Sequence, residues 1–397
     1  MEVVIKKQRN VTQLIFCSYY FMIFFGIGSF SPLLTVYLTD IIHLKGTQIG
    51  MITSMSPVVM IFAQPLWGVL ADYTQKSRVV LTVTLIFTAA MGIAFSFMNA
   101  YTMILFVAAL LAFFQSSLVP LSDSISLNYV QRTKGNYGSI RLWGAVGFAV
   151  AVLIVGRLSE EFGLHIIFYV FACSLLIASA FAWQLPKESQ TMRVNVRSGV
   201  AKLFRIPKFV LFLMTTFLVF GPIFANNFYF GLYITTIGGT LTGVGIAFLL
   251  AAGSEAPFMK ISSLVIRKFG IMQILCVAGA TSFVRWGFYF IEPPLALVYA
   301  TTILQGISIG LFIPSALEYV RSIAPNEVKV TAVSLYSAVG NGLGSWFCAF
   351  FGGIIIERYS ITVMYGCFSI MTLIGLGLIL VIWKLESRQR TEDGYEF

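Results

Sequence analysis

Twelve long apolar runs constrain this chain more than any other feature of its 397 residues. A helix that crosses a lipid bilayer needs about 20 apolar residues, and each run meets that length. The runs cover approximately residues 13–39, 46–71, 79–98, 102–129, 139–159, 164–184, 208–236, 240–266, 270–291, 295–321, 329–356 and 361–384. We therefore expect an all-α polytopic membrane protein with twelve transmembrane helices.

The composition agrees with lipid as the main solvent of this chain. Hydrophobic residues make up 58% of it and charged residues only 11%, whereas soluble domains carry roughly 25% charged residues. A soluble protein of this size cannot hide so much apolar surface. This excludes a cytosolic enzyme, a nucleic-acid-binding protein and a disordered scaffold. The five Cys lie in apolar runs and there are only two His, so the sequence predicts no metal site and no cofactor.

The distribution of Lys and Arg predicts how the chain is oriented. The longest polar gap, 185–207, separates an N-terminal six-helix half, 1–184, from a C-terminal six-helix half, 208–397. Most basic residues fall in this linker, in the loops on its side and near both ends of the chain. The opposite loops carry three, Lys45, Arg157 and Arg358. Since short cytoplasmic loops are enriched in Lys and Arg, both termini and the linker are predicted to be cytoplasmic. The same rule explains the net charge of +10 without a nucleic acid.

The two halves resemble each other in sequence. Ala145-Val146-Gly147 recurs as Ala338-Val339-Gly340, and Gln115 with Pro120 matches Gln305 with Pro314. Each match is weak alone, but their common order and nearly constant offset indicate a duplication. Two six-helix repeats in parallel are typical of secondary transporters, in which substrate binds between the halves near the middle of the bilayer.

The loop after the second run resembles a signature of the major facilitator superfamily. It reads Gly68-Val-Leu-Ala-Asp72-Tyr-Thr-Gln-Lys76-Ser-Arg78. The resemblance implies gating roles for Gly68, Asp72, Lys76 and Arg78, in which Asp72 bonds a basic neighbour or a helix N-terminus in one gate state. Tyr73 and Gln75 depart from the signature, which usually has a basic residue and a glycine there. The alternative is a hydrated interfacial turn.

A closer resemblance covers nearly the whole chain. The segments Gln64-Pro65-Leu-Trp67-Gly68 and Tyr137-Gly-Ser-Ile-Arg141-Leu-Trp143-Gly144 are similar to the lactose permease branch of the superfamily. Ser254-Glu255-Ala-Pro257-Phe258, followed by Arg285-Trp286, looks most like the nucleoside and phenylpropionate proton symporters of that branch. The resemblance implies the major facilitator fold and transport by alternating access.

Ionisable residues within spans are costly, so each is a candidate functional residue. By resemblance to lactose permease, Asp123 and Arg141 would bind substrate hydroxyls, and Phe148 would stack on the substrate where that protein has a tryptophan. The alternatives are a structural salt bridge for the pair and a core or lipid contact for Phe148. The change from tryptophan to phenylalanine weakens the expectation of a disaccharide substrate.

Glu255 and Arg285 are the predicted proton-coupling residues. Burial favours the neutral form of a carboxyl group and a nearby guanidinium favours the charged form, so Glu255 could load and release a proton. A fixed ion pair is the alternative. Thr302, Gln305 and Ser308 stand where lactose permease has its coupling residues, so either Glu255 or Asp123 replaces them, or the protein is a uniporter. Gln305 is a candidate substrate contact.

Asn226 and Asn227 lie inside an apolar span, where an amide is costly unless it is hydrogen-bonded. They are predicted to contact substrate, and the alternative is contact between helices.

The sequence thus predicts proton-coupled uptake of a small polar organic solute (a sugar, a nucleoside or an aromatic acid) by a multi-pass protein of the cell membrane. Small-molecule substrate, protons and the lipid bilayer are its expected partners, and we expect a monomer. Proton-driven efflux of amphipathic compounds is the second possibility. A membrane-embedded enzyme or a channel fits less well, because neither a catalytic cluster nor a carbonyl filter motif is visible.

Overall fold

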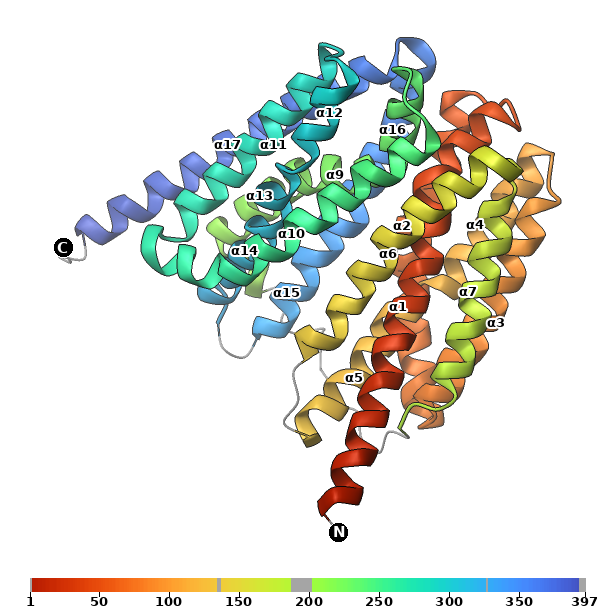
Figure 1. The fold of residues 1–397 in the computed structure, drawn as a ribbon. Helices are drawn as coiled ribbons and strands as arrows, with labels where there is room; N and C mark the ends of the chain where they lie inside the picture. The colour runs from red at the N-terminus through yellow and green to blue at the C-terminus, as the bar shows by residue number, and fades with distance from the viewer. Residues whose placement is uncertain (1, 134–136, 187–201, 326–327, 393–397) are drawn as a thin grey trace. The chain divides into compact units, whose positions relative to one another are not determined.

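The computed structural model describes residues 2–133, 137–186, 202–325 and 328–392, and all regular structure in these ranges is helical (Figure 1). Eleven helical segments among them are long and apolar enough to cross a membrane, and Ile166–Ala182 is a shorter apolar helix. Together they correspond to the twelve predicted spans, which confirms the predicted fold class. Most of the predicted linker lies outside the described residues, so the division into two halves at 185–207 stays a prediction.

Two compact units make up the fold. The first contains Met1–Met192 together with Asn227–Leu249. Its helices are α1 (Glu2–Asp40), α2 (Gly46–Thr74), α3 (Ser77–Ser96), α4 (Tyr101–Gln115), α5 (Leu118–Thr133), α6 (Tyr137–Phe162) and α7 (Ile166–Ala182). In this unit α1 packs against both α6 and α7, and α3 packs against α7 and α4. Helix α1 is therefore the central helix against which residues of α6 are placed.

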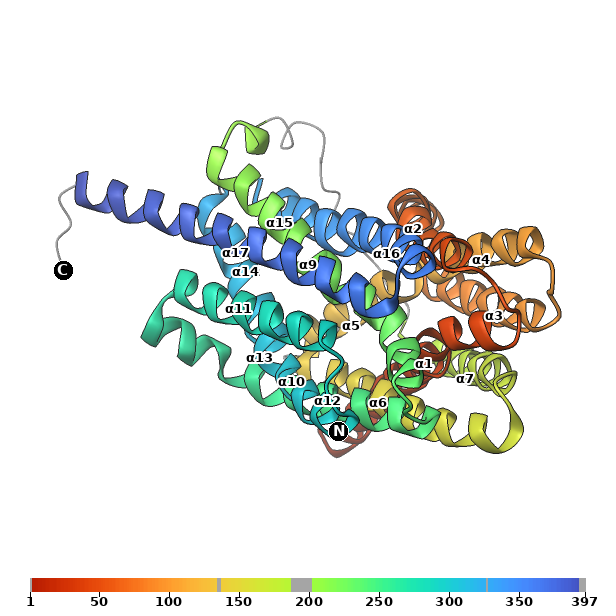
Figure 2. The same cartoon turned by 90° about the horizontal axis from the view of Figure 1, so that it is seen from above.

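The second unit contains Arg193–Asn226 and Leu250–Phe397. Helices α9 (Pro207–Thr236) and α10 (Leu241–Phe269) each contribute to both units. The remaining elements are α11 (Ile271–Phe290), α12 (Leu295–Thr302), α13 (Gln305–Gly310), α14 (Phe312–Ile323), α15 (Lys329–Ser337), the π-helix η2 (Ala338–Gly344), α16 (Ser345–Arg358) and α17 (Ile361–Glu392). Here α11 runs beside α17 and also contacts α13 and α14 (Figure 2).

Several spans are interrupted where the sequence carries helix-breaking residues. The fourth span divides into α4 and α5 just before Pro120, and the tenth divides into α12, α13 and α14 with its second break just before Pro314. Proline removes a backbone donor and crowds the preceding turn, which accounts for breaks at these places. In the eleventh span, the glycine-rich segment Ala338–Gly344 is a π-helix. A π-helix inside a span is a local departure from α-helical geometry, and such departures accompany kinks.

Residues 227–249 of α9 and α10 pack closely on the helices of the first unit. A Cβ atom at Gly231 would lie 2.2 Å from the Pro32 carbonyl oxygen, and one at Gly245 would lie 2.4 Å from the Leu153 Cα atom. Only glycine permits such close backbone approaches without movement. This packing places α10 against the face of α6 on which Phe148 lies.

Candidate functional site

The structure brings Asp123 of α5 and Arg141 of α6 together. The Arg141 Nε atom lies 4.0 Å from the Asp123 Oδ1 atom, and about a third of each side chain is exposed. This distance is within range of an ion pair but too long for a hydrogen bond, which for N–H···O falls between about 2.7 and 3.2 Å. The two side chains therefore need other groups to hold them in place.

Tyrosine hydroxyls provide the direct partners of Asp123. The Tyr20 hydroxyl donates to Asp123 Oδ1 at 2.6 Å and lies 2.7 Å from the Ser126 Oγ atom. The Tyr137 hydroxyl also interacts with the Asp123 carboxylate. The carboxylate is thus an acceptor for groups from α1 and α6, and hydrogen bonds to a charged acceptor are among the strongest in proteins.

Aromatic rings of α1 hold the guanidinium group of Arg141. Its central carbon lies 4.2 Å from the Phe24 ring centroid and 5.7 Å from that of Tyr20. The Tyr20 and Phe24 rings are parallel within 6°, with centroids 6.3 Å apart. Attraction between the cation and the ring faces therefore places Arg141 beside Asp123.

Phe148 lies further along α6 and is partly exposed. Its ring contacts that of Phe248 on α10 edge to face, with centroids 5.9 Å apart. Phe248 in turn contacts the Phe230 ring at 5.7 Å. The sequence predicted a contact role for Phe148 alone, and the structure shows it in a row of three aromatic rings.

The second unit contains a separate polar cluster built from α10, α11 and α13. The Gln305 Nε2 atom donates to Glu255 Oε1 at 2.8 Å, and the charge of Arg285 acts on the same carboxyl group. Arg285 is 2% exposed, its Nε donates to the Tyr289 hydroxyl at 3.0 Å, and its guanidinium lies 4.9 Å from the Trp286 ring centroid. Glu255, Arg285 and Gln305, which the sequence singled out separately, belong to one cluster.

Asn226 is buried and accepts a hydrogen bond of 2.9 Å from the Tyr365 hydroxyl. This bond joins α9 to α17, which is the contact between helices that the sequence left open as an alternative. Asn227 is half-buried. The Tyr365 ring also stacks on Trp286, with centroids 5.7 Å apart, so Asn226 is connected to the surroundings of Arg285 through aromatic side chains.

The signature loop connects α2 to α3. Gln75 has a φ of 54°, a left-handed conformation that favours glycine, which explains why glycine is the usual residue at this place. Within the described part of the chain, Asp72 forms no ion pair. Arg78 donates instead to the Leu185 carbonyl oxygen at 3.1 Å, and Lys76 precedes α3. Nothing lies within 4 Å of a Cβ atom built at Gly68.

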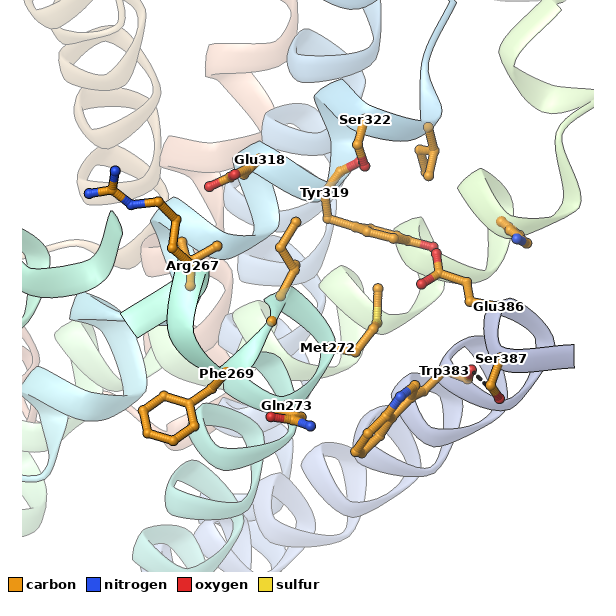
Figure 3. A pocket seen from close by; sticks show the side chains of 15 residues that line it. Arg267, Phe269, Met272, Gln273, Glu318, Tyr319, Ser322, Trp383, Glu386 and Ser387 are labelled. Atoms are coloured by element: carbon orange, nitrogen blue, oxygen red, sulfur yellow. Dashed lines mark hydrogen bonds between the residues drawn. The ribbon is translucent and has the colours of Figure 1, made fainter. Parts of the chain in front are cut away.

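A cavity of about 730 Å³ lies in the second unit, where the ends of α9, α10, α14 and α17 meet (Figure 3). Its polar lining includes Lys208, Arg267, Glu318, Tyr319 and Glu386. None of the substrate or proton residues predicted from the sequence is in its lining. Within the described residues, no three His, Cys, Asp or Glu side chains come close enough together to hold a metal ion.

Sequence reasoning missed the aromatic partners of the candidate residues. Tyr20 is 103 residues from Asp123, and Phe248 is a hundred residues from Phe148. One signal was present: a tyrosine inside an apolar run carries a hydroxyl that needs a partner when buried. Tyr20, Tyr289 and Tyr365 are all of this kind, although their partners could not be identified from the sequence.

A polytopic helical fold with ionisable and aromatic clusters inside its spans is the architecture of a membrane transporter. The chain belongs to the MFS_1 like family, whose sequence profile matches residues 14–367. It is 48% identical over 378 residues to a maltose permease of Geobacillus stearothermophilus, covering 95% of each chain. It is 22% identical over 371 residues to a xanthosine permease of Escherichia coli, covering 86% of this chain and 87% of that one.

The fold is also that of solved transporters. The crystal structure of a point mutant of the nucleoside transporter NupG aligns with a TM-score of 0.85 at 17% sequence identity, covering 94% of this chain and 99% of that one. Because the chain belongs to the MFS_1 like family and resembles permeases along its length, the protein is a secondary transporter of small solutes and not an enzyme. It is a multi-pass membrane protein of the major facilitator superfamily, as the resemblance in sequence implied.

Proposed function

We propose that this protein takes up a disaccharide of the maltose class together with protons. The observation that carries the proposal is the 48% identity, along 95% of both chains, to a protein named maltose permease. The chemistry of Asp123, Arg141 and Phe148 agrees with a sugar substrate. The Asp123 carboxylate accepts and the Arg141 guanidinium donates hydrogen bonds, as sugar hydroxyls require. Phe148 offers an aromatic face to the apolar side of a sugar ring.

The second cluster is our proposed site of proton coupling. Glu255 is hydrogen-bonded to the neutral side chain of Gln305, and the charge of Arg285 acts on it. When Glu255 is protonated, the cluster carries the Arg285 charge alone; when Glu255 releases its proton, the two charges attract each other. A carboxyl group with these two arrangements can carry a proton while the protein changes state. Gln305 is hydrogen-bonded to Glu255, and Asn226 to Tyr365. We therefore propose that the main role of Gln305 is to hydrogen-bond the Glu255 carboxyl group.

We further propose that the transporter lies in the cell membrane as a monomer, with both termini in the cytoplasm and lipid around its spans. The bias of Lys and Arg toward one set of loops supports this orientation. A reporter that is active only in the cytoplasm should be active when fused after Phe397. Gly68, Asp72, Lys76 and Arg78 remain the proposed gating residues. The Asp72 side chain is exposed in this structure, so it is free to form its proposed contact in another gate state.

Uptake into proteoliposomes tests the substrate and the coupling together. The purified full-length protein is reconstituted, an inward proton gradient is imposed, and radiolabelled maltose is supplied outside. We expect maltose to accumulate above its external concentration, and the accumulation to vanish when a protonophore removes the gradient. Unlabelled maltose should compete with the label, whereas xanthosine and 3-phenylpropionate should not.

Other outcomes would identify a different function. Accumulation of xanthosine or 3-phenylpropionate without maltose would contradict the sugar substrate. Maltose that only equilibrates, with or without the gradient, would indicate a uniporter. Gradient-driven movement of amphipathic compounds instead of maltose would support efflux.

A further inference from the structure

Tyr20 lies at the centre of the contacts that surround Asp123 and Arg141. It is fully buried on α1, and its hydroxyl is the donor in the 2.6 Å bond to Asp123 Oδ1. The Ser126 Oγ atom lies 2.7 Å from the same hydroxyl and fixes its direction from α5. Tyr20 thus reaches Asp123 by a much shorter contact than the 4.0 Å that separates Asp123 from Arg141.

The ring of Tyr20 also contributes to the position of Arg141. It is parallel to the ring of Phe24, one helical turn further along α1, and the Arg141 guanidinium contacts both rings. On the facing helix, Gly144 leaves the necessary space. A Cβ atom there would lie 2.7 Å from the Phe24 ring and 3.0 Å from an Arg141 nitrogen atom.

We propose that Tyr20 is a positioning residue for substrate recognition: its hydroxyl sets the direction of the Asp123 carboxylate, and its ring, with Phe24, sets the plane of the Arg141 guanidinium. The proposal rests on the proposed function, in which this pair binds sugar hydroxyls. Because Tyr20 contacts both the acceptor and the donor, the spacing between them is fixed before substrate arrives. A preformed spacing selects for one arrangement of hydroxyls.

The neighbouring Tyr19 provides a matched control. It is equally buried on the same helix, and its hydroxyl shares a hydrogen bond of 2.5 Å with the Ser122 Oγ atom on α5. Tyr19→Phe removes a buried phenol hydroxyl from the same two helices but leaves the Tyr20–Asp123 bond intact. A general loss of packing between α1 and α5 would affect both variants, whereas a loss of positioning would affect only Tyr20→Phe.

The main experiment measures maltose uptake by the parent, Tyr20→Phe and Tyr19→Phe in proteoliposomes. A hydrogen bond to a charged group affects equilibria by about tenfold or more. We expect KM to rise about tenfold in Tyr20→Phe with the maximal rate within about threefold of the parent, and both constants to stay within about threefold in Tyr19→Phe. Equal effects in the two variants, or a parent-like KM in Tyr20→Phe, would overturn the proposal.

Maltose derivatives that each lack one hydroxyl give a readout that packing alone does not change. The derivative that lacks the hydroxyl bound by Asp123 should be taken up about tenfold less well than maltose by the parent and by Tyr19→Phe. In Tyr20→Phe this ratio should approach one, because the carboxylate is no longer aimed at that hydroxyl. An unchanged ratio in Tyr20→Phe would show that Asp123 does not depend on Tyr20.

A second measurement does not require the substrate to be known. The thermal unfolding midpoints of Tyr20→Phe, Asp123→Asn and the double variant form a double-mutant cycle. We expect the two changes to be clearly non-additive, and additive changes would overturn the inference. If the cycle shows coupling but the parent does not take up maltose, the proposed substrate is wrong and the contact stands. If Tyr20→Phe does not fold, Ser126→Ala is decisive: we expect it to raise KM about fivefold, beyond the range allowed for Tyr19→Phe, and a KM within that range would contradict the proposal.

Discussion

Replacing Glu255 by glutamine separates proton coupling from substrate transport. The glutamine amide oxygen can still accept the hydrogen bond that Gln305 donates at 2.8 Å to Glu255 Oε1. The size of the side chain is nearly unchanged, but the amide cannot release a proton. Glu255→Gln should therefore resemble the protonated state of the cluster, in which Arg285 has no opposing charge on this side chain.

The expected magnitude follows from the energy of the gradient. A difference of one pH unit is worth about 1.4 kcal/mol per proton, which corresponds to about tenfold accumulation if one proton accompanies each sugar. With no membrane potential, the parent should approach this ratio of internal to external maltose. In Glu255→Gln, maltose should only equilibrate, at a ratio of internal to external concentration of about one, because the glutamine side chain cannot bind and release the proton that the gradient drives inward.

Accumulation and exchange of labelled maltose are measured in the same proteoliposomes. Exchange without a gradient should survive in Glu255→Gln, since it does not require proton release. Glu318→Gln is the matched control: it makes the same chemical change at an exposed glutamate beside the cavity of Figure 3, and should accumulate maltose like the parent.

Two results would refute this reasoning. If Glu255→Gln accumulates maltose like the parent, Glu255 is not the proton carrier and Asp123 becomes the next candidate. If exchange is also lost, Glu255 is a ligand or a structural partner of Arg285.

Three further predictions follow from individual contacts. Arg141→Lys should raise the KM for maltose at least tenfold, because one ammonium group can neither lie flat on Phe24 nor donate in two directions; a parent-like KM would remove the recognition role. Gly147→Ala should lower the unfolding midpoint by an amount equivalent to about 1–3 kcal/mol, because its Cβ would lie 2.3 Å from a carbonyl oxygen of α1. The control is Gly253→Ala, whose Cβ would have nothing within 4 Å and whose stability should stay within about 1 kcal/mol of the parent. Equal midpoints would contradict the close packing of α1 on α6. Glu160→Ala should lower the free energy of unfolding by about 1 kcal/mol. The Glu160 carboxylate accepts hydrogen bonds from the Thr242 backbone N–H at 2.8 Å and from the Thr242 hydroxyl at 2.7 Å, at the start of α10. An unchanged unfolding midpoint would show that this cap adds no stability.

The spans could be predicted from the sequence because their cause is local. A run of about 20 apolar residues must cross the bilayer as a helix, whatever the rest of the chain does. The breaks near Pro120 and Pro314 were not predicted, since the spans 102–129 and 295–321 were expected to be continuous, although proline disrupts the helix in which it lies. The similarity of Gln115–Pro120 to Gln305–Pro314 thus corresponds to interruptions in both spans.

The candidate site could be predicted only in part. Asp123 and Arg141 are 18 residues apart in the sequence and lie on consecutive spans, so their proximity could be inferred from sequence distance. The bond between Glu255 and Gln305 spans 50 residues, and that between Tyr20 and Asp123 spans 103. Such contacts depend on which faces of distant helices meet. Neither composition nor periodicity determines this in a membrane, where apolar residues occur on all faces.

The most direct test of proton-coupled uptake is whether protons enter the vesicles together with maltose. Proteoliposomes without any imposed gradient are loaded with a pH-sensitive dye, and maltose is added outside in a weakly buffered medium. If sugar and protons enter together, the interior should become acidic as maltose flows in, and a protonophore should abolish the change. Glu255→Gln should admit maltose without acidification. Entry of maltose into parent vesicles with no change in internal pH would contradict proton-coupled uptake.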